Sequence, residues 1–396
     1  MASDDNNLES EVFTYGVAEI IDQDSLRRRL SAGKPLKVKF GVDPTTPDLH
    51  LGHAIALRKL RQFQELGHHT VLLIGDFTTM IGDPSGRSAT RPVLSEDEIK
   101  ANMETYISQA KLIIDPEKTE VRFNSEWLSK KSYADFIKIA TQVSLQTLLE
   151  REDFSERIKN NQPLALHELF YPVTQGIDSV EMEADVEIGG WDQRLNLLMG
   201  RELQNKFGQT PQEIVVTKPL LGVDGERKMS KSYGNYVGLT EPPHEMFGKV
   251  MSIPDKLTDS YAELAALMNE SERSGLPEHP RDKKVAVAKK IVELYHGVEV
   301  ANLAAQNFDR AFSKGEVVSE LANEVLISGV TSITILEAVK HASGVSASEA
   351  ARLIDQGGVK LDGQVVADAN LTVDVSGATH RLQIGKHRFY ELVKEA

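Results

Sequence analysis

The feature that most constrains the fold of this chain is a strand–helix–strand alternation near its start. Residues 36–42 (LKVKFGV) have the composition of a short strand, and a loop with two prolines follows them. Apolar residues then recur at helical spacing over residues 50–66, and residues 70–77 (TVLLIGDF) form a second β-branched run. Units of this kind build a parallel, doubly wound sheet, whose ligands bind at the carboxyl ends of the strands.

The rest of the chain predicts two further domains after the doubly wound one, the first all-helical and the second mixed. Residues 125–165 are mostly helical in pattern, further strands are expected to end near residues 190 and 217, and residues 242–326 are helical with no convincing strand. The last residues mix helix-like and strand-like pieces. We therefore predict an α/β fold class with four segments: an N-terminal extension (1–34), a doubly wound domain with a helical insertion (35–238), an all-α domain (239–330) and a small α+β domain (331–396).

Composition excludes several classes of protein. The chain has no cysteine, which excludes disulfides, thiolate metal sites and iron–sulfur clusters. Its formal net charge of −14 argues against a protein that coats nucleic acid, although a local basic patch is compatible with it. No run of about 18 apolar residues occurs, and the acidic start of the chain has no secretory core. We expect a cytoplasmic protein with no membrane or DNA partner.

Two histidines flank a glycine where the first long helix should begin: His50, Gly52 and His53, in the sequence HLGH. A helix N-terminus offers free N–H groups and partial positive charge to a phosphate, and a glycine lets a base or ribose approach the backbone. The imidazoles can donate hydrogen bonds to phosphate oxygens whose charge grows in a transition state. The competing interpretation is a pair of surface histidines, and the motif alone does not decide. The adjacent pair His68 and His69 has diverging side chains, so we expect no protein-bound metal.

A glycine-rich, charged loop carries the second motif, Lys228 and Lys231 in KMSKS. A mobile loop can bring ammonium groups onto a triphosphate only while the reaction occurs, which favours the transition state over the ground state. Alone, the loop would be interpreted as a solvated charged segment. The predicted sheet, however, would bring both motifs to one edge, and together they are a strong signal.

The two motifs resemble the nucleotide-binding motifs of class I aminoacyl-tRNA synthetases. Four stretches are similar to the bacterial tyrosyl-tRNA synthetase family: GVDPTTPDLHLGH (41–53), GDFTTMIGDPSGR (75–87), YPVTQGIDS (171–179) and GGWDQRLN (189–196). Residues 344–366 resemble the S-four-like RNA-binding fold of that family. The resemblance implies a Rossmann-like catalytic domain, an α-helical anticodon-binding domain and an S-four-like C-terminal domain.

One helix face carries a group of hydrogen-bonding side chains, Tyr171, Gln175 and Asp178, at spacings i, i+4 and i+7. Three such residues without Lys or Glu fit a pocket better than a solvated stripe. The resemblance implies that Tyr171, Gln175 and Asp83 hold the substrate ammonium group and that Asp178 accepts a hydrogen bond from the tyrosine phenol. Tyrosyl enzymes are the known example of such selection, and they reject phenylalanine by about 10⁴–10⁵ because it leaves the buried acceptor unpaired. The alternative interpretation of Asp83 is that it forms part of an ordinary Asp-Pro-Ser-Gly turn and does not bind the ammonium group.

The resemblance also assigns residues around the nucleotide. Asp192 would bind the ribose, Gln193 would lie near the substrate carboxylate, Asn124 would line the pocket, and Asp43 and Thr45 would lie near the ammonium group and the phosphates. The ATP-binding set implied is Asp43, Thr45, His50, Gly52, His53, Asp192, Lys228 and Lys231.

Three positions depart from the commonest family pattern. Lys39 stands where many members have a tyrosine that touches the phenol, and it marks a second bacterial branch with VKxGxDPT. Ile177 and Trp191 replace an aromatic and a small hydroxyl residue, which puts the shape of the pocket, and so its amino acid, in question. The alternatives are a tryptophanyl-tRNA synthetase, an HxGH nucleotidylyltransferase and a non-catalytic RNA-binding protein.

The implied partners are L-tyrosine, ATP with Mg²⁺ as its substrate complex, and tRNA(Tyr). The resemblance also implies a homodimer formed through helices within residues 125–170. The region from residue 331 has seven lysines and arginines against eight acids, which gives 7 − 8 = −1, so the acidic excess lies upstream of it. The bulk charge can then repel non-specific nucleic acid while local patches bind one tRNA.

Overall fold

The computed structural model describes residues 9–85, 95–313, 322–327, 331–377, 379–385 and 388–394. The chain forms two compact units. Unit 1 comprises Met1–Thr240 with Ile253–Leu276, and unit 2 comprises Glu241–Ser252 with Pro277–Ala396. Residues 253–276, which we expected in the all-α domain, therefore cluster with unit 1, where they form α13 (Thr258–Leu264) and α14 (Glu270–Ser274).

A six-stranded sheet forms the centre of unit 1. Its order is β1-β6-β5-β2-β3-β4. The strands are β1 (Val17–Ile21), β6 (Glu213–Thr217), β5 (Val186–Gly190), β2 (Lys37–Val42), β3 (His69–Ile74) and β4 (Thr119–Phe123). All neighbouring pairs are parallel except β1 with β6. The doubly wound sheet predicted from the sequence is confirmed, and the strand order reverses between β2 and β5, which is where such sheets bind ligands.

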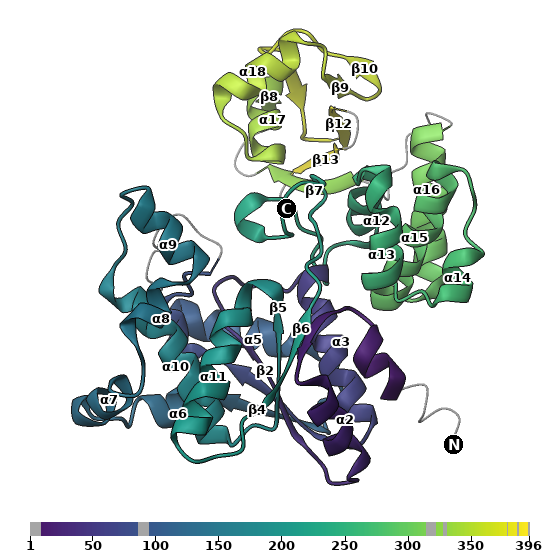
Figure 1. Cartoon of the computed structure of the whole chain (residues 1–396). Coiled ribbons are helices and arrows are strands. Elements are labelled where there is room, and N and C mark those ends of the chain that lie inside the picture. Colours follow the sequence, from purple (N-terminus) through teal and green to yellow (C-terminus); the bar gives the residue numbers. More distant parts are fainter. Residues whose placement is uncertain are drawn as a thin grey trace. The chain divides into compact units, whose positions relative to one another are not determined.

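Helices cover both faces of this sheet. The helix after β2 is α3 (Leu51–Glu65), and those flanking β5 are α10 (Leu166–Met182) and α11 (Arg194–Lys206). In Figure 1, α10 and α11 lie on one side of the strands and α3 on the other. The apolar stripe that predicted α3 is buried, with Leu51, Ile55 and Leu60 at 1% exposure or less. The expected strand over 70–77 is shorter, because α4 (Asp76–Ile81) already begins at its end.

The segment that we assigned to an N-terminal extension contributes to unit 1. It supplies the antiparallel edge strand β1 and α2 (Gln23–Ser31). The residues just before β1 are held by Lys59 of α3. Its buried ammonium group donates to the carbonyl oxygens of Glu11 at 2.9 Å and Val12 at 3.0 Å. An edge strand that pairs on one side only carries a weak sequence pattern, which is why β1 was not predicted.

The helical stretch between β4 and β5 is confirmed. It contains α6 (Ser125–Leu128), α7 (Tyr133–Ala140), α8 (Leu145–Leu149), α9 (Glu152–Lys159) and α10. A buried ion pair joins α9 to α10, with Arg157 Nη2 2.9 Å from Glu168 Oε2. The preceding helix α5 (Glu96–Ala110) starts with a capping box formed by Ser95 and Glu98.

Unit 2 begins with three helices, α12 (Pro243–Ser252), α15 (Pro280–His296) and α16 (Val298–Ser313), and ends in a small α+β part. This part contains β7 (Ala322–Ile327), β8 (Ser332–Thr334), α17 (Ile335–Ser343), α18 (Ala347–Asp355), β9 (Val359–Leu361), β10 (Gln364–Val365), β11 (Thr372–Asp374), β12 (His380–Ile384) and β13 (Arg388–Lys394). Its main sheet has the order β10-β9-β12-β13-β7.

The prediction of no strand before residue 326 is wrong. Strand β7 runs parallel to β13 at the edge of the sheet, with Val325 opposite Leu392. The C-terminal sheet therefore includes residues before 331, the boundary predicted from the sequence. The pairing partner lies about 65 residues later, so local periodicity does not reveal it. Among the described residues, no helix is long and apolar enough to cross a membrane.

Candidate active site

A cavity of about 770 Å³ lies at the switch point of the sheet in unit 1. Its walls come from the ends of β2 and β5, the start of α3, one face of α10 and the loop after β6. All fifteen residues that the sequence and the resemblance singled out line this one cavity: Lys39, Asp43, Thr45, His50, Gly52, His53, Asp83, Asn124, Tyr171, Gln175, Asp178, Asp192, Gln193, Lys228 and Lys231. The structure thus brings them together, and their individual roles stay predictions.

The HLGH motif forms the capped start of α3. His50 is the N-cap, and its Nδ1 accepts from the Gly52 backbone N–H at 3.1 Å, while His53 Nδ1 accepts from the His50 backbone N–H at 3.3 Å. A neutral imidazole has one N–H, so these contacts assign the proton of each ring to Nε2. A Cβ at position 52 would lie only 3.0 Å from His50 Nδ1, so the glycine keeps this cap uncrowded.

Both histidines are neutral near pH 7. Burial lowers the pKa of His53 to about 4, and the positive charge of Lys228 acts in the same direction. Burial, followed by the charges of His53, Lys228 and Lys231, holds the pKa of His50 well below its usual value. Each ring can therefore donate one Nε2–H hydrogen bond at the cavity without adding charge to it.

The KMSKS loop is folded around one buried asparagine. Asn235 Oδ1 accepts from the Ser230 N–H at 2.8 Å, and its Nδ2 donates to the Lys228 carbonyl at 3.2 Å. Gly222 lies against it, and a Cβ there would be 2.1 Å from Asn235 Nδ2. The loop backbone is thus held by Asn235, while the lysine side chains extend from it.

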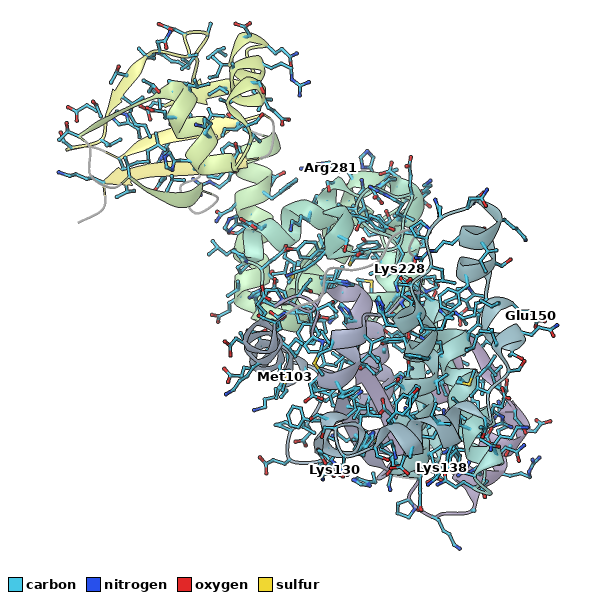
Figure 2. The ribbon with its side chains drawn as sticks, turned by 90° about the vertical axis from the view of Figure 1, so that its left-hand side faces the viewer. Met103, Lys130, Lys138, Glu150, Lys228 and Arg281 are labelled. Carbon is cyan, nitrogen blue, oxygen red and sulfur yellow. The ribbon has the colours of Figure 1, made fainter. Side chains whose placement is uncertain are left out.

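Each loop lysine has an acidic partner in the structure. Lys228 Nζ lies 2.6 Å from Asp192 Oδ1, and Lys231 forms an ion pair with Asp48. The Lys231 ammonium also lies 5.3 Å from the ring centroid of Tyr236. Burial would raise the pKa of Asp192, but the Lys228 charge and hydrogen bond outweigh it, so the pKa lies below its usual value. Figure 2 shows Lys228 at the other end of unit 1 from Lys130 and Lys138.

A buried carboxylate lies on the α10 face of the cavity. Asp178 Oδ1 accepts from Trp127 Nε1 at 2.8 Å, and Oδ2 accepts from Asn124 Nδ2 at 3.2 Å. Burial raises the pKa of Asp178 to about 7, although Lys39 and these two hydrogen bonds oppose the shift. The cavity therefore presents a hydrogen-bond acceptor that is costly to leave unpaired.

A second set of polar side chains in the cavity is suited to binding an ammonium ion. The Tyr171 hydroxyl donates to Asp43 Oδ2 at 2.8 Å, and Gln193 Nε2 donates to Asp83 Oδ2 at 2.7 Å. Gln175 Oε1 is buried with no hydrogen-bond partner among the described residues, so it is an acceptor that a ligand can satisfy. Asp83 Oδ1 also accepts from the Ser85 N–H at 2.9 Å, which is the turn contact of the alternative interpretation.

The departures from the family pattern differ in position. Ile177 is buried in a hydrophobic cluster with Val71, Leu73 and Trp127, and it is not part of the cavity lining. Trp191 lines the cavity and remains about half exposed, at 51%. Trp191 thus bears on the shape of the entrance, and Ile177 acts through packing behind the wall.

Sequence reasoning missed three residues that organise this site: Glu187, Asp48 and Asn235. Glu187 pairs with Lys39, and Asp48 pairs with Lys231. Asn235 accepts a hydrogen bond from the Ser230 N–H inside the KMSKS loop. The signal that could have identified Glu187 is a single charged residue inside the apolar strand VEIGG. Across the described residues, no group of three or more His, Asp or Glu side chains could hold a metal ion.

Class I aminoacyl-tRNA synthetases combine this sheet topology with a histidine pair at a helix start and a lysine loop. Comparison with known protein families assigns the chain to this class. The family described as tRNA synthetases class I (W and Y) matches residues 31–313, and the S4 domain family matches residues 338–378. The chain belongs to the tyrosine–tRNA ligase family, as its curated relatives show.

Three of these relatives are bacterial tyrosine–tRNA ligases. The protein from Haemophilus influenzae is 48% identical over 385 residues, which cover 94% of each chain. The protein from Moorella thermoacetica is 47% identical over 96% of this chain and 94% of its own. The protein from Carboxydothermus hydrogenoformans is 44% identical over the full length of both.

Solved structures agree on the fold. A C-terminally truncated mitochondrial tyrosyl-tRNA synthetase from Aspergillus nidulans has a TM-score of 0.63 at 19% identity, covering 79% of this chain and 100% of its own. A tyrosyl-tRNA synthetase from Archaeoglobus fulgidus, complexed with L-tyrosine, has a TM-score of 0.60 at 22% identity, covering 74% of this chain and 98% of its own.

Proposed function

We propose that the cavity in unit 1 activates L-tyrosine with ATP and that the chain then transfers tyrosine to the terminal adenosine of tRNA(Tyr). The observation that carries this proposal is the meeting, in one cavity, of the nucleotide motifs with the buried acceptor Asp178. The nucleotide motifs suit a triphosphate, and the Asp178 carboxylate suits a hydroxyl on an otherwise apolar side chain.

The first step needs no covalent nucleophile from the protein. The tyrosine carboxylate attacks the α-phosphorus of ATP in line, a P–O bond forms, and the bond to pyrophosphate breaks, which leaves tyrosyl-adenylate. His50 and His53 donate Nε2–H bonds to phosphate oxygens, and Lys228 and Lys231 neutralise the charge that develops there. Mg²⁺ arrives with ATP as part of the substrate complex.

The second step takes place at the carbonyl carbon of tyrosyl-adenylate. A ribose hydroxyl of the terminal adenosine attacks the mixed anhydride, the ester bond forms, and AMP leaves. The carboxylates of Asp43 and Asp83, with Tyr171 and Gln175, hold the amino group so that this carbon stays in place. The S4 domain supports binding of the tRNA by unit 2.

Tyrosine is favoured over tryptophan because the acceptor lies deep in the cavity. Asp178 is 2% exposed and sits beside Trp127, where it can meet a phenol hydroxyl. An HxGH nucleotidylyltransferase would have no use for this acceptor, nor for an S4 domain. A non-catalytic RNA-binding protein would have no need of the intact histidine pair and lysine loop.

Amino-acid-dependent ATP–pyrophosphate exchange tests the proposal. With tyrosine, phenylalanine and tryptophan supplied separately, we expect exchange with tyrosine and at most traces with the other two. Exchange that prefers tryptophan would replace the proposed substrate. A chain that charges no amino acid but still binds tRNA would be the RNA-binding alternative.

We also propose that the chain is a homodimer in the cytoplasm and that helices α7 to α10 form the interface. Their exposed apolar side chains support this: Tyr133, Ile137, Leu145, Ile158 and Leu166. Tyr133 is 81% exposed and Leu166 is 67% exposed, and apolar side chains gathered on one group of helices mark an interaction surface, whereas single ones do not.

Charge placed on this surface is expected to separate the copies. The double variant Tyr133→Asp with Leu166→Asp should sediment as a monomer at concentrations where the unchanged chain is a dimer, because burial of a carboxylate at the interface is costly. Analytical ultracentrifugation measures it. The matched control is Val365→Asp, on an exposed residue of β10 in unit 2, which should remain dimeric. A double variant that stays dimeric would place the interface elsewhere.

A further inference from the structure

Glu187 is a buried acid at the second position of β5, where it lines the cavity, and none of the motifs predicted it. It is 1% exposed, and each of its oxygens accepts two hydrogen bonds. Oε1 accepts from Lys39 Nζ at 2.7 Å and from Gln175 Nε2 at 3.3 Å. Oε2 accepts from Ser179 Oγ at 3.1 Å and from Gln212 Nε2. The Oε1 partners both line the cavity, whereas neither Oε2 partner does.

The pair formed by Lys39 and Glu187 is built into the sheet at its switch point. Strands β2 and β5 are parallel, and these two residues are directly opposite in register. Lys39 is 0% exposed, so its charge is buried and depends on Glu187 for compensation. An ammonium group has three donors, and Glu187 is the one hydrogen-bond partner that the described residues give it. The remaining donors can serve a ligand in the cavity that Lys39 lines.

A second carboxylate, that of Asp178, lies near the same lysine. Asp178 and Lys39 are close enough to interact electrostatically, and both line the cavity. If Lys39 paired with Asp178, the acceptor for the substrate phenol would be occupied. Glu187 offers Lys39 a carboxylate outside that role, and it orients the Gln175 amide so that its orphaned Oε1 is left for the substrate ammonium group.

We propose that Glu187 is a positioning residue for amino-acid selection. It holds Lys39 where the ammonium group donates to the phenol oxygen, and it keeps Lys39 away from Asp178, which accepts the phenol proton. The inference rests on the proposed tyrosine activation. It adds a second hydrogen bond to the recognition of the hydroxyl, with Glu187 acting through Lys39 and not by touching the substrate.

The isosteric variant Glu187→Gln tests this role. We expect its KM for tyrosine in pyrophosphate exchange to rise about 10- to 100-fold, the size expected for one charge-assisted hydrogen bond. The KM for ATP and the kcat at saturating tyrosine should change little, because the nucleotide groups are untouched. The preference for tyrosine over phenylalanine should fall by a similar factor. Glu187→Asp should restore part of both.

A double-mutant cycle with Lys39→Met separates positioning from a structural effect. Because Glu187 acts through Lys39, adding Glu187→Gln to Lys39→Met should leave the ratio of kcat/KM for tyrosine and phenylalanine as it is in Lys39→Met alone. Full additivity of the two effects would overturn the inference, and so would an unchanged KM for tyrosine in Glu187→Gln. If Glu187→Gln does not fold, the tyrosine-to-phenylalanine ratio of Lys39→Met is compared with that of the double variant, in which no charge of the pair remains buried, and a difference between the two overturns the inference.

Ser179→Ala is the matched control. It removes a hydrogen bond to the same carboxylate, on Oε2, and leaves Lys39 and Gln175 in place. Its KM for tyrosine should stay within about twofold of the unchanged chain. If the unchanged chain shows no tyrosine-dependent exchange, the proposed function fails; if it does, and Glu187→Gln behaves like Ser179→Ala, the inference about Glu187 alone fails.

Discussion

Asp178→Asn is expected to lower kcat/KM for tyrosine by about 10²–10⁴ and to remove most of the preference over phenylalanine. The carboxylate offers two acceptor oxygens, one facing Trp127 and one facing Asn124, and the phenol proton needs a free lone pair beside them. An asparagine has a single acceptor oxygen, and its amide would point a donor either at Asn124 or at the phenol. Pyrophosphate exchange with each amino acid measures the ratio.

The same substitution should also change how the stability of the fold depends on pH. Burial raises the pKa of Asp178 from 3.8 to about 7, so between these values the folded chain binds a proton that the unfolded chain has released. The free energy of unfolding contributed by this group therefore falls as the pH rises from about 4 to about 7, and it stays low above that range. Asparagine has no such titration.

Urea unfolding at pH 5 and pH 8, without substrates, checks this sign. The stability of Asp178→Asn relative to the unchanged chain should be higher at pH 8 than at pH 5. A relative stability that does not depend on pH would show that Asp178 titrates normally. In that case, a loss of tyrosine selection would have to come from geometry and not from a buried charge held ready for the phenol.

Periodicity predicted the elements that lie at the centre of each unit. Strand β3 is buried along almost its whole length and is a nearly continuous apolar run, and α3 before it has an apolar stripe that packs on the sheet. Strands β1 and β7 were missed because each lies at a sheet edge and pairs with a strand distant in sequence. A pattern within a few residues carries little information about such pairing.

The site was predicted as far as its residues lie in motifs. The histidine pair, the lysine loop and the α10 face each occupy a short stretch of chain, and the sheet topology then brings them to one cavity. Glu187, Asp48 and Asn235 were missed because their roles exist only in contacts with residues 5 to 183 positions away. Sequence spacing predicts which groups touch the substrates, and the fold is needed to show what holds those groups.

Lys231→Ala is expected to lower the rate of tyrosyl-adenylate formation by about 10²–10³ while leaving the affinity for tyrosine unchanged. The Lys231 ammonium group pairs with Asp48 and lies near the Tyr236 ring, at the nucleotide motifs of the cavity. The triphosphate would replace Asp48 as its partner, and the attraction grows as charge develops on the leaving pyrophosphate. Single-turnover formation of the adenylate gives the rate, and equilibrium dialysis gives the tyrosine affinity.

Two control variants show which property of Lys231 matters. Lys130→Ala removes an exposed lysine that lies well away from the loop, and it should leave the rate unchanged (Figure 2). Asp48→Asn breaks the same ion pair as Lys231→Ala but keeps the ammonium group, so its rate should not fall. If both members of the pair reduced the rate equally, the ion pair would act by holding the loop in shape. A loss confined to Lys231→Ala assigns the effect to the positive charge itself, delivered to the phosphates by the loop that Asn235 supports.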